Sequence, residues 1–308
     1  SLPAMTPKDI EDLDFIIAKQ LDWVALSFVR KAEDIVDLKR RVQEQNSKIK
    51  VMAKIEMPSA MDDLRNIVNE SDGVMVARGD LGVELPVEKV PMAQREIIRK
   101  CIHRSKPVIV ATQMMESMMD RTKPNRSEIT DVANAVIDGA DAVMLSGETS
   151  MGKYPARVIQ VMEKILSNIE TANLIYNKEL KAVSTSESFI SDAICYNAAR
   201  ISSDLGAKAI IGMTFSGYTG FMLSSYRPKA EIYIFTENHD LLNSLSICWG
   251  VRAFHYNKFV GTDTSIRDVT RILKENSLIK TGDMIVNIGS MPLAARGRAN
   301  MVKVTMVV

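Results

Sequence analysis

The sequence predicts an α/β protein in two parts, a partial (β/α)8 TIM barrel followed by a doubly wound α/β domain. Apolar runs of strand length alternate with helix-like stretches along the chain, and this alternation is typical of parallel sheets. The runs are nearly continuous in apolar residues, as expected for strands with both faces covered. In the first half, each run ends in a polar or charged cluster, which is where barrels carry their chemistry.

The first part, residues 1–173, contains five such βα units. Its first helix is expected to begin after Thr6, with Pro7 at the first helical position and Asp9 completing a capping box. The predicted strands are 24–30, 51–56, 74–80, 108–113 and 142–148. The predicted later helices are 31–45, 59–69, 88–104, 127–138 and 154–173, with Ser59 and Ser127 as candidate caps.

The second part, residues 174–308, opens with a polar and irregular stretch that marks the predicted domain boundary. The predicted helices are 188–204, 217–226, 239–248 and 263–276, and the predicted strands between and after them are 208–215, 231–236, 251–256 and 283–289. A last apolar segment, 301–308, is expected to be an edge strand.

Five strands are too few for a closed barrel of eight. A parallel sheet that stopped at five would leave long unpaired edges, which proteins avoid. Two explanations remain open: the first part is a smaller open sheet, or further βα units are missing from its N-terminal side. We favour the second explanation, and we expect that Ser1 is not the natural start.

The composition excludes several classes of protein. A net charge of +1 in 308 residues argues against strong attraction to nucleic acid or to a membrane. No apolar run is long enough to span a bilayer, and the polar start does not resemble a signal peptide. Cys101, Cys195 and Cys248 lie far apart, so we expect buried thiols in a cytoplasmic protein.

The polar ends of the five predicted strands should converge on one site. They carry Ser27, Arg30, Lys54, Glu56, Arg78, Asp80, Thr112, Gln113, Ser146 and Glu148. Lys54 and Glu56 are two residues apart, so both point to one side of their strand, about 6.6 Å apart along it. Gly79 lets the backbone approach a ligand, and Asp80 follows it.

Two carboxylates on neighbouring strand ends, Glu56 and Asp80, match the preference of Mg²⁺ for one or two carboxylates completed by water and substrate oxygens. Lys54 beside them suggests an anionic ligand such as a phosphate. The alternative is a structural ion pair at the rim. The hydroxyls of Thr112 and Ser146 can bind a carboxylate or relay a proton, or they can simply cap the next helix, which is the favoured reading for Thr149.

A second candidate site lies in the C-terminal part, where a strand is followed by Thr-Phe-Ser-Gly-Tyr-Thr and a helix. Hydroxyls, free N–H groups and the helix dipole form a phosphate cradle there. Its candidate ligands are Thr214, Ser216, Gly217 and Thr219, with Arg296 and Arg298 from a late loop that could swing beside it. The alternative is an ordinary helix N-terminus.

Several strings resemble those of pyruvate kinases. They are MAKIE, MVARGDLGVELP, VIVATQMMESM, RSEITDVANAVIDGADAVMLSGET and KYP, in that family's order and spacing. MVARGDLG and DAVMLSGET are highly specific. The resemblance covers the whole chain, but it corresponds to the part of a complete enzyme that follows the small lid domain. It therefore implies that the N-terminal barrel strands and the lid are absent, and that the chain is inactive alone.

The resemblance implies phosphoryl transfer from phosphoenolpyruvate to ADP, giving pyruvate and ATP. Lys54 resembles the lysine that stabilises the phosphoryl group in flight, and Glu56 and Asp80 resemble the Mg²⁺ ligands. Gly79, Asp80 and Thr112 resemble substrate-binding positions. Ser146 and Glu148 resemble a pair near the enolate, in its proton relay.

The resemblance also implies a K⁺ requirement, with most of the K⁺ site in the absent part, and a homotetramer in which Arg126 lies near a contact between barrels. It further implies a sugar-phosphate or nucleotide effector, although Tyr218 stands where several relatives carry a basic residue. Two other functions remain open. One is a non-catalytic effector-binding and assembly module, and the other is a Mg²⁺-dependent lyase of pyruvate-like acids.

Overall fold

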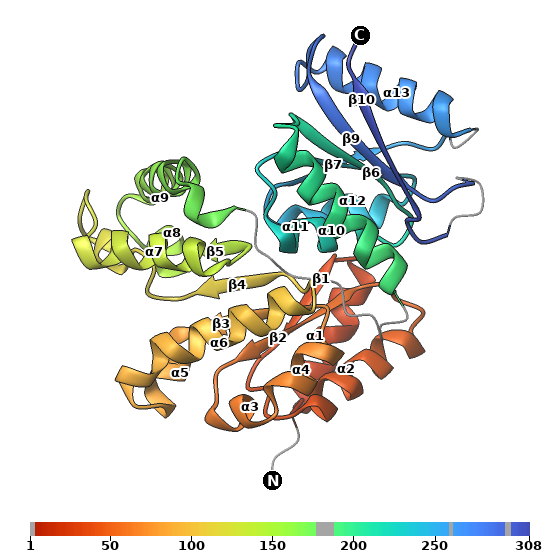
Figure 1. Ribbon diagram of the computed structural model, residues 1–308. Helices are drawn as coiled ribbons and strands as arrows, with labels where there is room; N and C mark the ends of the chain where they lie inside the picture. Colours follow the sequence, from red (N-terminus) through yellow and green to blue (C-terminus); the bar gives the residue numbers. More distant parts are fainter. Residues whose placement is uncertain (1–3, 177–187, 259–260, 293–296) are drawn as a thin grey trace. The chain divides into compact units, whose positions relative to one another are not determined.

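The computed structural model describes residues 4–176, 188–258, 261–292 and 297–308 (Figure 1). The chain divides into two compact units, Ser1–Ile175 and Tyr176–Val308. Each unit contains one five-stranded sheet, and each is described separately below.

The sheet of the first unit is entirely parallel, with strands in the order β1-β2-β3-β4-β5. The strands are β1 (Trp23–Leu26), β2 (Lys50–Ile55), β3 (Gly73–Ala77), β4 (Val108–Ala111) and β5 (Ala142–Met144). Each strand pairs with the next one in the sequence, and the crossovers between them are helical (Figure 1). This is the strand order of a (β/α)8 barrel, and the five predicted units are confirmed.

The helices of the first unit are α1 (Pro7–Ala18), α2 (Ala32–Glu44), α3 (Pro58–Asp62), α4 (Leu64–Glu70), α5 (Arg78–Glu84), α6 (Val90–His103), α7 (Arg126–Asp138), α8 (Gly147–Ser150) and α9 (Pro155–Glu170). Three short 3₁₀ turns join them: η1 (Val87–Lys89), η2 (Glu116–Met119) and η3 (Asn173–Ile175). Consecutive crossover helices contact one another in the order α2, α4, α6, α7 and α9. They therefore form the outer layer of an incomplete barrel.

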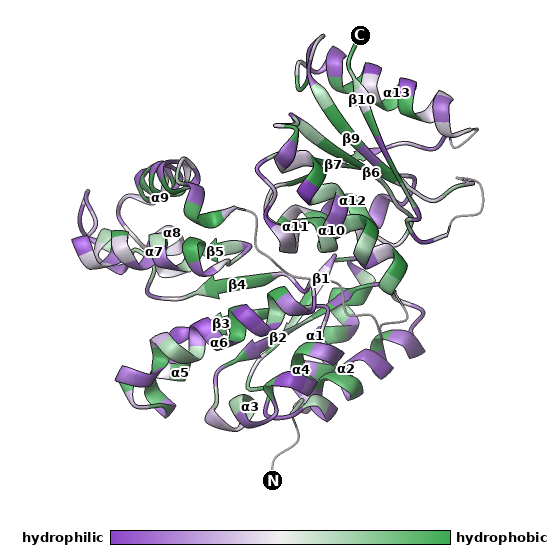
Figure 2. Ribbon diagram, viewed as in Figure 1, coloured by the Kyte–Doolittle hydropathy of each residue, from purple (hydrophilic) through white to green (hydrophobic). Residues whose placement is uncertain are grey.

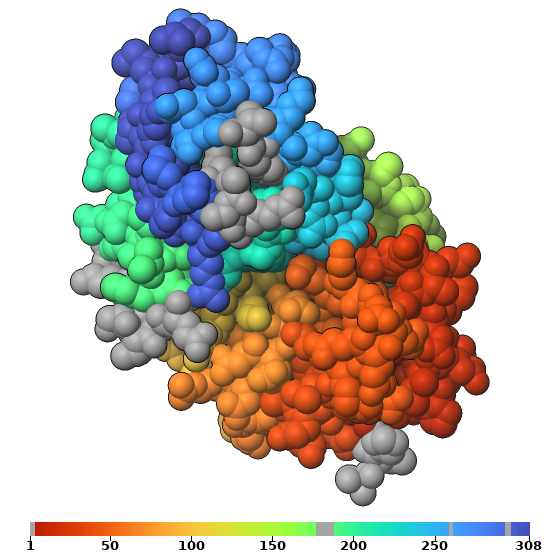
Figure 3. All heavy atoms as spheres, turned by 90° about the vertical axis from the view of Figure 1, so that its right-hand side faces the viewer, coloured from red at the N-terminus to blue at the C-terminus, as the bar shows by residue number. Residues whose placement is uncertain are grey.

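The core of the first unit lies between the sheet and these helices. Alternate strand residues such as Ile55, Val76 and Val110 are fully buried against helix residues such as Ile67 and Ile97. In Figure 2 the apolar residues gather on the inner sides of the helices and along the strands. In Figure 3 the early elements of this unit, red to orange, cover one of its faces. Because side chains alternate along a strand, Lys54 lies on the sheet face opposite Ile55 and the helices.

The predicted capping box of α1 is confirmed, since Thr6 Oγ1 accepts the Asp9 N–H and Asp9 accepts the Thr6 N–H. The other two predicted caps are wrong. Helix α7 is capped by Asn125 with Glu128, so Ser127 lies inside the helix, and Ser59 lies inside α3 after Met57. Pro58 and Asn125 make the earlier starts favourable, because proline suits the first helical turn and asparagine is a good N-cap.

Several predicted elements also differ in extent. The strands predicted at 24–30, 108–113 and 142–148 end earlier, at Leu26, Ala111 and Met144. Strand β3 ends at Ala77, and Arg78, Gly79 and Asp80 form the first turn of α5 rather than the strand end. The helix predicted at 59–69 is broken into α3 and α4 at Asp63. The Asp63 carboxylate accepts hydrogen bonds from the Ala32 N–H and the Asn66 side chain, and these bonds hold the break.

The sheet of the second unit has the order β10-β9-β6-β7-β8. Its strands are β6 (Ala209–Met213), β7 (Glu231–Thr236), β8 (Val251–His255), β9 (Met284–Gly289) and β10 (Met301–Met306), and its helical elements are α10 (Phe189–Asp204), α11 (Tyr218–Tyr226), α12 (His239–Ser244), η4 (Leu245–Ile247) and α13 (Thr262–Glu275). Only β10 is antiparallel among the described strands, and it lies at the edge as predicted.

Helices cover both faces of this second sheet. Ile210 and Ile232 pack with residues of α10, α11 and α12, whereas Ile211 and Tyr233 pack with residues of α13. The strand order reverses around β6, which pairs with both β7 and β9. The doubly wound α/β architecture is therefore confirmed.

Candidate active site

The carboxyl ends of β1 to β5 bring most of the predicted residues to one edge of the first sheet. Because the strands are parallel and paired in register, the residues that follow each strand lie beside those that follow its neighbour. This edge, called the rim below, carries Ser27, Lys54, Glu56, Gly79, Asp80, Thr112, Gln113, Ser146 and Glu148.

Lys54 and Glu56 form an ion pair at the end of β2. The Lys54 Nζ lies 2.6 Å from Glu56 Oε1 and donates to Ser27 Oγ at 2.8 Å. The Glu56 side chain is only 1% exposed, whereas that of Lys54 is 25% exposed. The pair thus keeps a buried carboxylate neutralised and holds the ammonium group at an accessible edge.

The second oxygen of Glu56 fixes the turn after β1. Glu56 Oε2 accepts the Phe28 N–H at 2.5 Å, and Phe28 has a left-handed backbone with φ 53°. Left-handed conformations are unusual for residues other than glycine and cluster at functional sites. One carboxylate therefore supports both the lysine and the neighbouring turn.

Asp80 follows the neighbouring strand, β3. It is exposed in the first turn of α5. It and the buried Glu56 follow adjacent strands, β2 and β3. Among the residues that the structure describes, no group of three or more His, Cys, Asp or Glu side chains is arranged to hold a metal ion. Two carboxylates that follow adjacent strands are a donor set that suits Mg²⁺, which takes one or two carboxylates and keeps its other ligands from water and substrate.

Thr112 contacts the start of α5 directly. Its Oγ1 accepts the Gly79 N–H at 2.7 Å and donates to the Ala111 carbonyl at 2.6 Å. Thr112 and Gln113 both have left-handed backbones, with φ 67° and 54°. The structure thus brings Gly79 and Thr112 into direct contact.

Arg78 lies beside the rim, at the start of α5, and the sequence predicted its position but no role for it. Its side chain is buried, donates to the carbonyls of Thr112 and Gln113, and forms an ion pair with Asp131 of α7. The partners are separated from Arg78 by more than thirty positions of sequence. No local signal could therefore have revealed them.

Ser146 and Glu148 lie together, but their environments differ. Ser146 is exposed, while Glu148 is 3% exposed and accepts the N–H groups of Ser146 at 2.8 Å and Met115 at 3.1 Å. The Glu148 carboxylate therefore holds the turns after β4 and β5, and the Ser146 hydroxyl is the group at the surface. The hydroxyls of Thr149 and Ser150 donate to the Ser146 carbonyl. The bond of Thr149 is therefore local, but it is not the predicted cap, because Thr149 lies inside α8.

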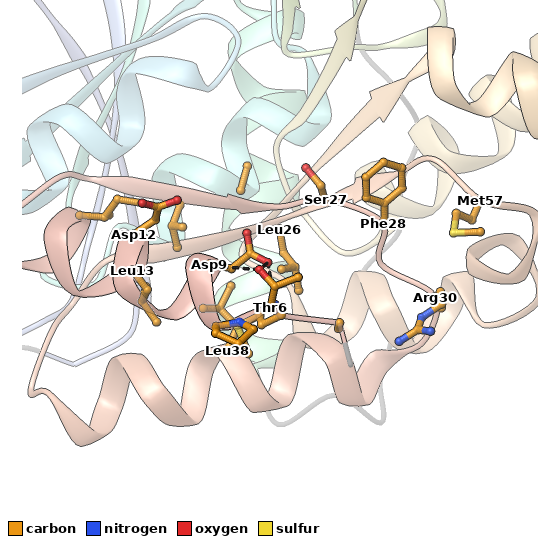
Figure 4. A pocket seen from close by; sticks show the side chains of 16 residues that line it. Thr6, Asp9, Asp12, Leu13, Leu26, Ser27, Phe28, Arg30, Leu38 and Met57 are labelled. Atoms are coloured by element: carbon orange, nitrogen blue, oxygen red, sulfur yellow. Dashed lines mark hydrogen bonds between the residues drawn. The ribbon is translucent and has the colours of Figure 1, made fainter. Parts of the chain in front are cut away.

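Arg30 extends away from these residues towards α2. Its Nε lies 3.8 Å from Asp34 Oδ2. It also lines a cavity of about 1040 Å³ between α1 and β1, together with Thr6, Asp9, Ser27 and Phe28 (Figure 4). Among the described strands, β1 has a partner on one side only, and no pattern in the sequence predicted the cavity.

In the second unit, the predicted phosphate cradle stabilises itself. Thr214 Oγ1 accepts the Gly217 N–H at 3.2 Å, and Ser216 Oγ accepts the Tyr218 N–H at 3.4 Å. Gly217 has φ 81°, and a Cβ there would lie 3.0 Å from Leu241 Cδ2, so glycine is needed. Thr219 is buried, where its side chain faces Gly212.

Tyr218 joins this turn to α10. Its hydroxyl donates to Asp192 Oδ1 at 2.5 Å and lies 3.0 Å from Ser188 Oγ. Burial, followed by this bond to Asp192, raises the pKa of Tyr218 to about 12. The guanidinium carbon of Arg298 lies 6.0 Å from the centre of the Tyr218 ring, so Arg298 does lie beside the turn. Arg296 lies outside the described residues.

Family models identify both units. The model of the pyruvate kinase barrel domain matches residues 1–159, and that of the pyruvate kinase alpha/beta domain matches residues 192–305. The chain belongs to the pyruvate kinase family. It is 39% identical over 311 residues to a pyruvate kinase of Lactobacillus delbrueckii subsp. bulgaricus, covering 99% of this chain and 52% of that protein.

Pyruvate kinase of Staphylococcus aureus is likewise 39% identical over 310 residues, covering 100% of this chain and 52% of that protein. Among solved structures, a pyruvate kinase from Cryptosporidium parvum matches with a TM-score of 0.92 and 36% identity, covering 100% of this chain and 63% of that one. This chain therefore spans about half the length of the curated relatives it matches. Within the described ranges, no helix combines the length and apolarity needed to cross a membrane.

Proposed function

We propose that this chain supplies the larger part of the catalytic barrel and the C-terminal domain of a pyruvate kinase. The reaction is phosphoryl transfer from phosphoenolpyruvate to ADP, giving pyruvate and ATP. One observation carries the proposal: Lys54 is held by Glu56 and Ser27 at a strand end, beside the strand that leads into Asp80. Phosphoryl transfer depends on positioning and charge neutralisation, which this arrangement offers.

Glu56 and Asp80 are the proposed ligands of Mg²⁺. When bound, the ion would neutralise phosphate charge and orient the transferred group. Lys54 adds a fixed positive charge, which stabilises the negative charge that develops in the transition state more than that of the bound substrate. The K⁺ requirement is proposed on family membership, with most of its site outside this chain.

Thr112 and Gly79 are the proposed binding edge for the substrate carboxylate. The hydroxyl of Thr112 and the backbone at 79–80 face each other across the ends of β3 and β4. For protonation of the enolate, Ser146 is the better placed of the predicted pair because its hydroxyl is exposed. Glu148 acts through Ser146, since its carboxylate is buried and accepts the Ser146 N–H.

The open sheet is the basis of a second part of the proposal. Within the described residues, β1 and β5 each pair on one side only. We propose that further βα units complete the barrel in the natural polypeptide that carries these residues, called the complete protein below. The isolated 308-residue chain should then lack activity, because its barrel is not closed.

Assembly and regulation are also proposed, on the basis of family membership. The complete protein should be a homotetramer, with Arg126 near a barrel contact. The turn at 214–219 should bind the phosphate of a sugar phosphate or nucleotide, with Arg298 and Arg296 contributing positive charge. Calorimetric titration with fructose bisphosphates, ribose 5-phosphate, glucose 6-phosphate and AMP tests this site, and sizing with light scattering tests the assembly.

The central test is a coupled assay of the complete protein, in which lactate dehydrogenase consumes the pyruvate formed from phosphoenolpyruvate and ADP. Activity should require Mg²⁺ and should be absent from the isolated chain. A complete protein that bound phosphoenolpyruvate but formed no pyruvate with ADP would refute the proposed reaction. Activity in the isolated chain would refute only the need for a closed barrel.

A further inference from the structure

The turn after β4 has a backbone that its own residues do not favour. Thr112 and Gln113 follow one another in left-handed conformations, with φ 67° and 54°. A β-branched residue such as threonine is a genuine outlier there. Strain of this kind persists only where the surroundings impose it, so some neighbouring group must hold the turn.

Arg78 is that group. Its side chain is 8% exposed, and its Nη2 donates to the carbonyls of Thr112 at 2.7 Å and Gln113 at 3.2 Å, the two residues with strained backbones. The same nitrogen also contacts Met114 Sδ. The other terminal nitrogen, Nη1, is anchored by Asp131 on α7. A planar guanidinium can serve an ion pair and two carbonyls at once, which the single ammonium of lysine cannot reproduce.

The residue after Arg78 completes the arrangement. The Gly79 N–H donates to Thr112 Oγ1 at 2.7 Å, so residues 78 and 79 hold both the backbone and the hydroxyl of Thr112. The Glu148 carboxylate contacts the same loop only further on, at the Met115 N–H. Release of the two carbonyls would let Thr112 and Gln113 relax, and the hydroxyl would leave Gly79.

We propose that Arg78 is a positioning residue that imposes the left-handed turn at Thr112 and Gln113 and thereby sets the Thr112 hydroxyl against Gly79. Its effect on the turn stands on the structure alone. Its effect on catalysis rests on the proposed function, in which Thr112 and Gly79 bind the substrate.

The kinetic test uses the complete protein with Arg78→Lys. A charged hydrogen-bond donor of this kind is worth roughly ten- to hundredfold, so KM for phosphoenolpyruvate should rise at least about tenfold. Arg95→Lys is the matched control, since Arg95 also pairs with an acid of α7, Asp138, but its side chain is exposed and bonds to no rim residue among those described. The control should leave KM and kcat unchanged.

A second substitution separates positioning from general support of the fold. Glycine adopts left-handed backbones without strain, and the Gln113 side chain is exposed. Gln113→Gly should therefore reverse part of the rise in KM that Arg78→Lys causes. If Arg78→Lys does not fold, Asp131→Asn loosens the same guanidinium, and the comparison with and without Gln113→Gly is made there.

Hydrogen–deuterium exchange of peptides that contain Gly79 provides a readout independent of activity. In Arg78→Lys the Gly79 amide should exchange at least about tenfold faster, and Gln113→Gly should restore its protection. Unchanged protection at Gly79 would overturn the proposal. So would a loss that glycine does not restore, because Arg78 would then support the fold in general. A complete protein without pyruvate kinase activity would refute the proposed function and leave this exchange result standing.

Discussion

Two strand-to-helix turns in this molecule are built in opposite ways. The turn after β4, residues 112–115, is held by buried charged groups from other segments, Arg78 and Glu148. The turn after β6, residues 214–217, is held by its own hydroxyls, with Thr214 and Ser216 accepting nearby N–H groups. Both turns follow a buried strand and contain left-handed residues.

The difference concerns where the restraints come from. A turn whose own hydroxyls accept its N–H groups needs few hydrogen-bond partners from other segments. Substitutions in those segments should therefore have little effect on its conformation. A turn held by charges from distant segments depends on each of them, because a buried charge or hydrogen-bonding group that loses its partner is costly. The rim of the first unit should therefore respond to single substitutions far more strongly than the cradle of the second.

The largest effect is expected from Lys54→Met in the complete protein. Loss of one fixed charge at the reacting group should lower kcat by about 10²- to 10³-fold, with KM for phosphoenolpyruvate changed less. The coupled assay measures both constants. Lys8→Met is the control, since Lys8 also pairs with an acid but is fully at the surface. A higher KM at normal kcat would make Lys54 a binding residue instead.

The next largest effect is expected from substitution of the two proposed metal ligands. Glu56→Gln and Asp80→Asn each remove one carboxylate charge, so each variant should need at least about tenfold more Mg²⁺ for half-maximal activity. Glu56→Gln should be the more severe, because it also removes the partner of Lys54. Titration of activity with Mg²⁺, after removal of metal with a chelator, gives the comparison. Normal Mg²⁺ dependence in both variants would contradict the assignment.

A direct comparison of the two turns uses Glu148→Gln and Thr214→Val. Glu148→Gln removes a charged acceptor from the N–H groups of Met115, which is buried, and Ser146, and this should destabilise the first unit by about 1–3 kcal/mol. Thr214→Val removes one neutral hydrogen bond worth about 1 kcal/mol. Calorimetry should show the larger fall in Tm for Glu148→Gln. If Thr214→Val were the more destabilising, the proposed contrast between the turns would be wrong.

The smallest effect is expected at Tyr218 and only at high pH. Its pKa is raised from the ordinary 10.0 to about 12 by burial and by the bond to Asp192. Because the folded pKa exceeds the unfolded one, its stabilising contribution is complete below pH 10 and is lost as pH rises from 10 towards 12. Difference absorbance between the starting protein and Tyr218→Phe should show one tyrosinate forming near pH 12. Ionisation near pH 10 would contradict both the burial of the Tyr218 hydroxyl and its bond to Asp192.

Local sequence patterns predicted the features that depend on neighbouring residues in the chain. The apolar runs predicted the strands of both sheets, although not the order β10-β9-β6-β7-β8 of the second, and Thr6 with Asp9 predicted the start of α1. Lys54 and Glu56 could be paired because strand geometry places residues two apart on one side. The alternative prediction, an ion pair between Lys54 and Glu56, is also confirmed, since the two side chains form one.

Contacts between distant segments could not be predicted in this way. Asp63 breaks the helix expected at 59–69 because it bonds to Ala32, which lies 31 residues earlier. Tyr218 looked like a substitution in a ligand loop, but its hydroxyl bonds to Asp192, 26 residues away. The apolar run predicted Arg78 at a strand end, whereas it lies at the start of a helix and bonds to Thr112, 34 residues away.

The carboxylate of Glu56 has one further consequence. One of its oxygens is paired with Lys54 and the other accepts the Phe28 N–H, so any cation that binds Glu56 competes with both. Binding at this carboxylate is therefore thermodynamically linked to the conformation of the turn after β1, and linkage is reciprocal. A change that loosens Phe28 should strengthen cation binding, and a bound cation should in turn free the backbone beside Ser27.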